Sequence, residues 1–172
     1  SVLPTIWFRN TWSWGYENYK EQPTIKGIND SLIEVNHKLV GKFNLFAENP
    51  KDLLFCDNNT NYEKLYGSAA QSLYAKDGIN DYVINKKSNA INPDRIGTKA
   101  SVFYDDSIPP LGKKEYRLRF TNTTPEDAFS DFDSLFQKRI QEADDFYAPI
   151  QKGVKDEKLK SIQRQAYAGM LW

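Results

Sequence analysis

Residues 24–37, with the sequence TIKGINDSLIEVNH, decide the fold of this chain. Two runs rich in aliphatic and β-branched residues, 24–28 and 31–37, flank the dipeptide formed by Asn29 and Asp30. A two-residue Asn/Asp turn between such runs is typical of a β-hairpin. The stretch therefore predicts two antiparallel strands that turn at Asn29 and Asp30.

Further strand-like segments lie on both sides of this hairpin. Residues 53–56, LLFC, are continuously apolar, as expected for a strand covered on both faces. The sequence 114–120 alternates Tyr116, Leu118 and Phe120 with charged residues, and a Pro-Pro-Leu-Gly turn at 109–112 precedes it. Seven or eight short strands without intervening helices predict a mainly β chain, an antiparallel β-sandwich; the other expected strands are 2–9, 40–47, 82–84 and 98–104.

The hydrophobic period changes from two to between three and four at residue 124. The sequence TPED at 124–127 is a helix-start signal, and Pro149 and Gly153 are expected to end the first helix. A second helix is predicted to start near Asp156 and to run to the last residue. The sandwich is therefore expected to be followed by two α-helices.

The final helix has no stop signal before its apolar last residues, Leu171 and Trp172. We therefore expect the chain to be a piece of a larger protein. An uncovered apolar helix face at this end also predicts a possible route of self-association, through Tyr167, Leu171 and Trp172.

Composition is that of a globular protein and narrows the classes of partner. Hydrophobic residues make up 40% of the 172 residues and charged residues 27%. Lys+Arg and Asp+Glu balance at 23 each, so neither nucleic acid nor an anionic membrane is an expected partner. The single cysteine excludes an internal disulfide framework and favours the cytoplasm.

Few residues in the chain are candidates for catalysis or for binding a metal or cofactor. One histidine, His37, and one cysteine, Cys56, cannot form a zinc site, and Cys56 is expected to be a buried thiol. No glycine-rich phosphate motif occurs, so no cofactor is expected. The oxygen-rich run 57–63 lacks the glycine and glutamate of an EF-hand, which favours a hydrogen-bonded loop over a metal site. Adjacent aspartates, as at 105–106 and 144–145, identify no catalytic dyad.

The aromatic run at residues 7–15, WFRNTWSWG, is the strongest candidate for ligand binding. If the strand continued, Trp12 and Trp14 would share a side, and Arg9 could bond polar groups beside them. Arg9, Trp12 and Trp14 are the candidate substrate-binding residues, as an aromatic platform that faces a sugar. The alternative is an anchor that packs against a domain outside this chain.

Several stretches of the sequence resemble large proteins related to glycoside hydrolase family sixty-three. That family includes the processing α-glucosidase I of the glycoprotein pathway and bacterial mannosylglycerate and α-glucoside hydrolases. The resemblance covers nearly the whole chain and is carried, in order, by residues 3–15, 54–61, 76–83, 92–93, 97–100, 131–133, 142–147 and 163–172.

The resemblance implies an architecture more than a chemistry. Such proteins look like an N-terminal, supersandwich-like β-sandwich, a helical linker and a catalytic (α/α)6 barrel. Residues 1–123 would be an incomplete part of the sandwich, 124–153 the linker helix and 154–172 the truncated start of the barrel. The general acid and the general base would lie in that barrel, so no residue of this chain is assigned a catalytic role.

The expected function is therefore that of a non-catalytic support in an inverting α-glycosidase that acts on glucosides or mannosides. Its partners would be the (α/α)6 barrel of the same polypeptide and the glycoside substrate. The loop at residues 12–14 and the long polar connection at residues 57–81 would help shape the rim of the substrate cleft. Two alternatives are a stand-alone carbohydrate-binding β-sandwich module and a self-associating structural domain.

Overall fold

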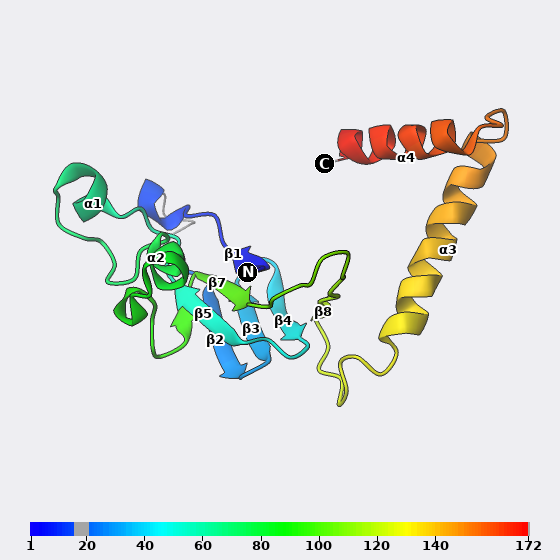
Figure 1. Ribbon diagram of the computed structural model, residues 1–172. Helices are drawn as coiled ribbons and strands as arrows, with labels where there is room; N and C mark the ends of the chain where they lie inside the picture. Colours follow the sequence, from blue (N-terminus) through cyan, green and yellow to red (C-terminus); the bar gives the residue numbers. More distant parts are fainter. Residues whose placement is uncertain (16–20, 172) are drawn as a thin grey trace. The chain divides into compact units, whose positions relative to one another are not determined.

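The computed structural model describes residues 1–15 and 21–171 and divides into two compact units, Ser1–Glu126 and Asp127–Trp172. The described part of the first unit holds a three-stranded and a five-stranded antiparallel sheet (Figure 1). The smaller sheet has the order β1 (Thr5–Trp7), β7 (Lys99–Phe103), β5 (Asp52–Cys56). The larger has the order β6 (Ile96–Gly97), β2 (Thr24–Asn29), β3 (Leu32–His37), β4 (Gly41–Ala47), β8 (Leu118–Thr121).

The predicted hairpin is confirmed, with its turn one residue further along. Strand β2 pairs with β3, and a register shift between Gly27 and Asn29 moves the turn to residues 30–31. The Asn29 side chain accepts the backbone N–H of Ser31 at 2.9 Å, and the Arg95 guanidinium donates to the Asn29 carbonyl at 2.6 Å. These two bonds stabilise the displaced turn.

The two sheets share one hydrophobic core, which confirms the sandwich-like arrangement of a mainly β unit. Alternate residues of each strand point inward, as the period of two requires. The larger sheet contributes Ile25, Ile33, Val35, Leu45 and Ala47; the smaller contributes Leu53, Phe55, Ala100 and Val102, with Tyr104 just beyond β7.

Strand β5 is covered on both faces, as its uninterrupted apolar sequence predicted. Leu53 and Phe55 enter the core between the sheets, whereas Leu54 and Cys56 pack against Ile79 on the opposite face. Its edge away from β7 is also occupied, because the Phe55 carbonyl accepts the N–H of Asn92 at 2.8 Å, from the segment that precedes β6. This segment therefore protects an edge that would otherwise offer unpaired backbone groups.

The prediction of a strand at residues 82–84 is wrong, and so is the expectation of a β unit without intervening helices. Four α-helices occur in the described residues, two of them between β5 and β6: α1 (Tyr62–Tyr66) and α2 (Gly78–Asn85). Tyr82 and Val83 pack with Ile79 on the outer face of the small sheet, at helical spacing. This one-sided burial favours the helix over the strand suggested by three apolar residues.

Strand β8 is shorter than predicted. Only the last part of the alternating sequence pairs with β4, although Tyr116 and Leu118 do pack against the core. The turn at residues 109–112 is confirmed by the 2.9 Å bond from the Gly112 N–H to the Pro109 carbonyl. It joins β7 and β8, which belong to different sheets.

The second unit contains α3 (Phe132–Ile150) and α4 (Glu157–Leu171). The predicted start at residue 124 is wrong, because α3 begins eight residues later. Thr124 is used differently: its hydroxyl and the Thr123 carbonyl accept hydrogen bonds from the Asn44 side chain, at 3.3 and 3.0 Å. The end of α3 at Ile150 and the start of α4 beside Asp156 agree with the prediction.

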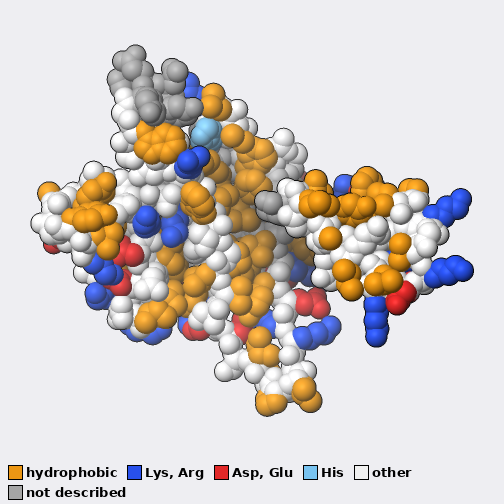
Figure 2. All heavy atoms as spheres, turned by 90° about the horizontal axis from the view of Figure 1, so that it is seen from above, with side chains coloured by type: hydrophobic (Ala, Val, Ile, Leu, Met, Phe, Trp, Pro, Cys, Tyr) orange, Lys and Arg blue, Asp and Glu red, His pale blue; other side chains and the backbone are white. Residues whose placement is uncertain are grey.

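Polar and aromatic contacts join α3 and α4. Arg164 forms a 2.6 Å ion pair with Asp144 and lies over the ring of Tyr147, which also stacks with Tyr167. Gln151, buried between the helices, donates to the Lys160 carbonyl at 2.8 Å. Hydrophobic side chains remain on the surface of this unit (Figure 2); they include Leu135, Phe136, Ile140, Phe146, Ile162, Met170 and Leu171. No helix in the described residues is long and apolar enough to cross a membrane.

Replacement of Gly97 by alanine is expected to destabilise the first unit by about 1–3 kcal/mol, because a methyl group there would collide with the Cys56 carbonyl. The free energy of unfolding, measured by denaturant titration, checks this. Gly169→Ala, in open space on α4, is the control and should be neutral or slightly stabilising. Equal stability of Gly97→Ala and the parent protein would contradict the packing described.

Cys56 is expected to resist thiol reagents until the first unit unfolds. Its side chain is fully buried, and burial raises its pKa to about 12, so almost no thiolate exists at about pH 8. Labelling with a chromogenic disulfide should be slow in buffer and fast in denaturant. Rapid labelling of the native protein would show that the outer face of β5 is open.

Candidate functional site

The candidate site lies over β1, on the outer face of the small sheet. Trp7 is directly opposite Lys99, and Thr5 is opposite Ser101. These four residues share the face that carries Leu54 and Cys56 further across the sheet. Helix α2 covers that face over β5, and the surface over β1 remains open, with Trp7 54% exposed.

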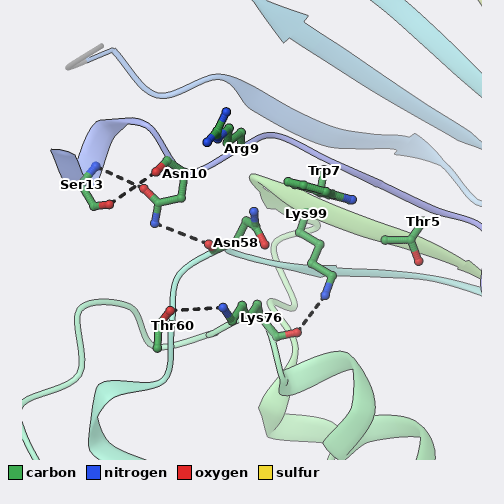
Figure 3. A pocket seen from close by; sticks show the side chains of 9 residues that line it. All are labelled: Thr5, Trp7, Arg9, Asn10, Ser13, Asn58, Thr60, Lys76 and Lys99. Carbon is green, nitrogen blue, oxygen red and sulfur yellow. Dashed lines mark hydrogen bonds between the residues drawn. The ribbon is translucent and has the colours of Figure 1, made fainter. Parts of the chain in front are cut away.

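A hollow of about 490 Å³ opens at this point (Figure 3). Its lining is mostly polar and comes from β1 and the turn that follows it, from the segment after β5, from the residue before Asp77, and from β7. The lining residues are Thr5, Trp7, Arg9, Asn10, Ser13, Asn58, Thr60, Lys76 and Lys99.

The first wall is the chain that follows β1. The 3-10 helix η1 (Trp12–Trp14) is preceded by Asn10, whose side-chain oxygen accepts the Ser13 N–H at 3.2 Å. The Ser13 hydroxyl in turn donates to the Asn10 carbonyl at 3.4 Å. The wall is therefore a hydrogen-bonded turn that presents an amide and a hydroxyl to the hollow.

The second wall is the segment after β5, and Asn58 attaches it to the first. The Asn58 side chain donates to the Phe8 carbonyl at 2.8 Å, and its backbone N–H donates to the Thr98 hydroxyl at 2.8 Å. Asn10 completes the link with a 3.5 Å bond to the Asn58 carbonyl. The run 57–63 is thus a hydrogen-bonded loop, as expected, in which Asn61 caps α1 by accepting the Lys64 N–H at 3.0 Å.

Two lysines form the third side of the hollow. The Lys99 ammonium donates to the Lys76 carbonyl at 3.0 Å, and the Lys76 ammonium donates to the Thr60 hydroxyl at 3.2 Å. The Lys76 backbone N–H is bonded to the Asn59 carbonyl at 3.0 Å. In these bonds both ammonium groups donate to neutral oxygen atoms (Figure 3).

The charge of the hollow is therefore positive. Arg9, Lys76 and Lys99 line it, and its lining contains no Asp or Glu. Within residues 1–15 and 21–171, none of these three cations forms an ion pair with a carboxylate. Such a site can donate hydrogen bonds to anionic oxygens, while its hydroxyls and amides suit a polar ligand.

Of the predicted substrate-binding residues, the structure places only Arg9 in the hollow. Strand β1 ends at Trp7, so Trp12 and Trp14 lie in η1 and do not alternate as a strand would require. Trp14 stays 47% exposed, with the Arg9 guanidinium 4.8 Å from its ring centroid. Trp12 is half-buried, and its indole N–H has no hydrogen-bond partner among the described residues.

Trp7 and the two lysines were missed by the sequence prediction. The alternation of Thr5 and Trp7 along the first strand could have identified the side chains that share its outer face. Lys76 and Lys99 offer no such signal, because their proximity depends on the path of the connection between residues 57 and 77. Isolated lysines in a charge-balanced sequence resemble ordinary surface residues.

The remaining polar candidates have structural roles. The ring nitrogen Nδ1 of His37 accepts the backbone N–H groups of Leu39 and Val40, at 3.1 and 3.3 Å, and its ring stacks on Phe8. Cys56 is buried on the outer face of β5. Among the described residues, no cluster of three or more His, Cys, Asp or Glu side chains could hold a metal ion.

An ion-pair network beside Lys76 holds the start of α2. Burial would raise the pKa of Asp77, but hydrogen bonds from Lys64 and Asn61 outweigh it and lower this pKa. Lys64 lies 2.9 Å from Asp77 and 3.7 Å from Asp81, so one ammonium joins α1 to α2. The network thereby fixes the chain on which Lys76 is presented.

Comparison with known proteins yields one relative of unassigned activity. The chain is similar to a Saccharomyces cerevisiae protein described as "Uncharacterized protein YMR196W", with 31% identity over 206 aligned residues. The alignment covers 99% of this chain and 19% of the yeast protein, so the chain spans less than a fifth of that relative. No family model matches the chain, and no solved structure matches it significantly.

The Asp77 network predicts a loss of stability in acid. A carboxylate with a lowered pKa stabilises the fold above the ordinary aspartate value of 3.8, and this contribution disappears as the pH falls through the folded pKa. Asp77→Asn should therefore lower the melting temperature at about pH 6, with a smaller difference at about pH 3. Asp94→Asn, at an exposed loop position, is the control; an Asp77→Asn deficit that is unchanged at both pH values would contradict the prediction.

Proposed function

We propose that this chain is the non-catalytic β-sandwich and helical linker of an inverting α-glycosidase related to glycoside hydrolase family sixty-three. One observation carries the proposal: all nine residues that line the hollow belong to four of the stretches that resemble that family, 3–15, 54–61, 76–83 and 97–100. Stretches separated in sequence converge on one surface, which supports a shared role in ligand binding.

The composition of the hollow supports a carbohydrate ligand. Trp7 presents an exposed aromatic ring beside Thr5, Asn10, Ser13 and Asn58. Sugar rings stack their C–H faces on aromatic rings and bond their hydroxyls to amide and hydroxyl groups. In this proposal the hollow lies at the rim of the substrate cleft. Trp7, in place of Trp12 and Trp14, supplies the aromatic ring that faces the sugar.

The helical unit supports attachment to further protein. The exposed apolar side chains of α3 and α4 would be covered by an (α/α)6 barrel, with α3 as linker and α4 as the first barrel helix. In this proposal residues 1–123 belong to a supersandwich-like domain. The match to a fraction of a much longer yeast protein supports such a multidomain context.

The proposal assigns the chemistry to carboxylates of the barrel, so that residues 1–172 alone would be inactive. It needs no cofactor, no nucleic acid and no membrane, and it places the enzyme in the cytoplasm. A stand-alone carbohydrate-binding module is the second candidate, favoured by the same exposed Trp7. Sugar binding by residues 1–172, without glycosidase activity in the full-length protein, would favour this candidate.

Trp7→Ala is expected to raise the KM of the full-length protein for nitrophenyl α-glucosides or α-mannosides by about tenfold, as the loss of one aromatic contact predicts. The value of kcat should change little, because Trp7 is not assigned to the chemistry. Tyr66→Ala, an exposed aromatic residue on α1 outside the hollow, is the control.

Two outcomes would contradict the proposal. If the full-length protein hydrolysed no α-glycoside, its assignment to the α-glycosidases would be wrong. Glycoside turnover by residues 1–172 alone would remove the purely supporting role.

A further inference from the structure

We infer that the hollow over β1 binds a phosphorylated sugar, with Lys76 and Lys99 at the phosphate, Trp7 against the sugar ring and Arg9 as a further positive charge across the hollow. The sugar in this inference rests on the proposed function, whereas the phosphate rests on the three cations alone. The inference therefore makes two claims, one on charge and one on ring recognition, that can be tested separately.

The lack of counter-ions is the first argument. Several other lysines of this unit have carboxylate partners, such as Lys51 with Asp105 and Lys64 with Asp77 at 2.9 Å. Lys76 and Lys99 instead donate to a hydroxyl and to a carbonyl. Each ammonium has three N–H donors, so both retain donors for a ligand oxygen.

The amount of charge is the second argument. Three cations without carboxylate partners among the described residues line one hollow of about 490 Å³, and they come from three separate segments. A phosphate monoester carries a charge of about −1.5 to −2 at neutral pH and three acceptor oxygens, whereas a carboxylate carries one charge. Arg9 lies on the Trp14 side of the hollow, with its guanidinium 4.8 Å from the centroid of that ring, and adds to the positive potential. The site thus favours phosphate over a carboxylate.

The arrangement of the side chains is the third argument. Lys99 is paired with Trp7 across β1 and β7, and its side chain extends from beside Trp7 to the Lys76 carbonyl (Figure 3). A substituent of a ring stacked on Trp7 could therefore reach toward the two lysines. Thr60 lies beside Lys76, whereas Asn58 lies between Asn10 and the lysines, and these groups would give sugar hydroxyls polar partners (Figure 3). The volume falls within the range of small-ligand sites.

Titration calorimetry on the full-length protein at low salt tests the inference with four probes: glucose 6-phosphate, glucuronate, glucose and inorganic phosphate. Glucose 6-phosphate should bind at least tenfold more tightly than each of the other three. Its affinity should fall as sodium chloride is added, because the cations are exposed to screening. Equal binding of glucose and glucose 6-phosphate would overturn the charge claim, and equally tight inorganic phosphate would overturn the ring claim.

Charge-neutralising variants test the site itself. Lys76→Gln and Lys99→Gln should each weaken glucose 6-phosphate binding about tenfold, as the loss of one charged hydrogen bond predicts. Lys76→Arg should keep most of the affinity and shows that a Gln variant has not simply misfolded. Lys86→Gln is the matched control, because this exposed lysine contacts the Val83 carbonyl outside the hollow. Unchanged affinity in both hollow variants would overturn the site.

A parallel assay of α-glycoside hydrolysis separates this inference from the proposed function. If the protein has no hydrolase activity but binds glucose 6-phosphate, and the Gln variants lose this binding, the phosphate site stands and the proposed glycosidase function is wrong. If the protein hydrolyses α-glycosides but does not bind glucose 6-phosphate, the proposed function stands and the phosphate site is wrong.

Discussion

Burial of β5 on both faces is the constraint on which the rest of the first unit depends. Leu53 and Phe55 join the two sheets through a common core, and Leu54 and Cys56 hold α2 on the outside. Full burial of one large aliphatic or aromatic side chain contributes about 1.5–3 kcal/mol, so this short strand supplies a substantial part of the stability of a marginally stable fold. Asn92 bonds to the Phe55 carbonyl at the edge of the same strand that faces away from β7, so β5 is covered on both faces and bonded at this edge.

The position of the candidate site depends on how far α2 covers the outer face of the small sheet. Helix α2 packs over β5 and does not extend over Trp7 and Thr5, so the outer face of the small sheet changes from apolar and covered to polar and open. The connection from β5 to α2 must cross beside this open face, and it brings Asn58 and Lys76 to its border. The scaffold therefore determines the position of the hollow, and the connecting segments determine its chemistry.

Local patterns predicted the strands well and the site less well. The hairpin at 24–37 and the enclosed strand at 53–56 were predictable because alternation and continuous apolarity report burial directly. Residues 82–84 were misassigned because three apolar residues fit a strand and a helix equally, and only packing against Leu54 and Cys56 distinguishes them. Thr124 has the sequence signature of a helix cap, but Asn44, eighty residues away, uses its hydroxyl. Lys76 and Lys99 could not be paired from sequence, since their contact depends on the whole path between them.

The pairing of β1 with β7 has a kinetic consequence. Thr5 and Ser101, bonded through their hydroxyls at 2.7 Å, are 96 positions apart in the chain. Closure of so long a loop is entropically costly and slows folding, and β1 has only three residues to offset it. During synthesis β1 leaves the ribosome long before β7 exists, so Ile6, which packs against the core in the folded unit, remains exposed to solvent until then. The hollow is then among the last features of the unit to form, and its ligand would act on the final step of folding.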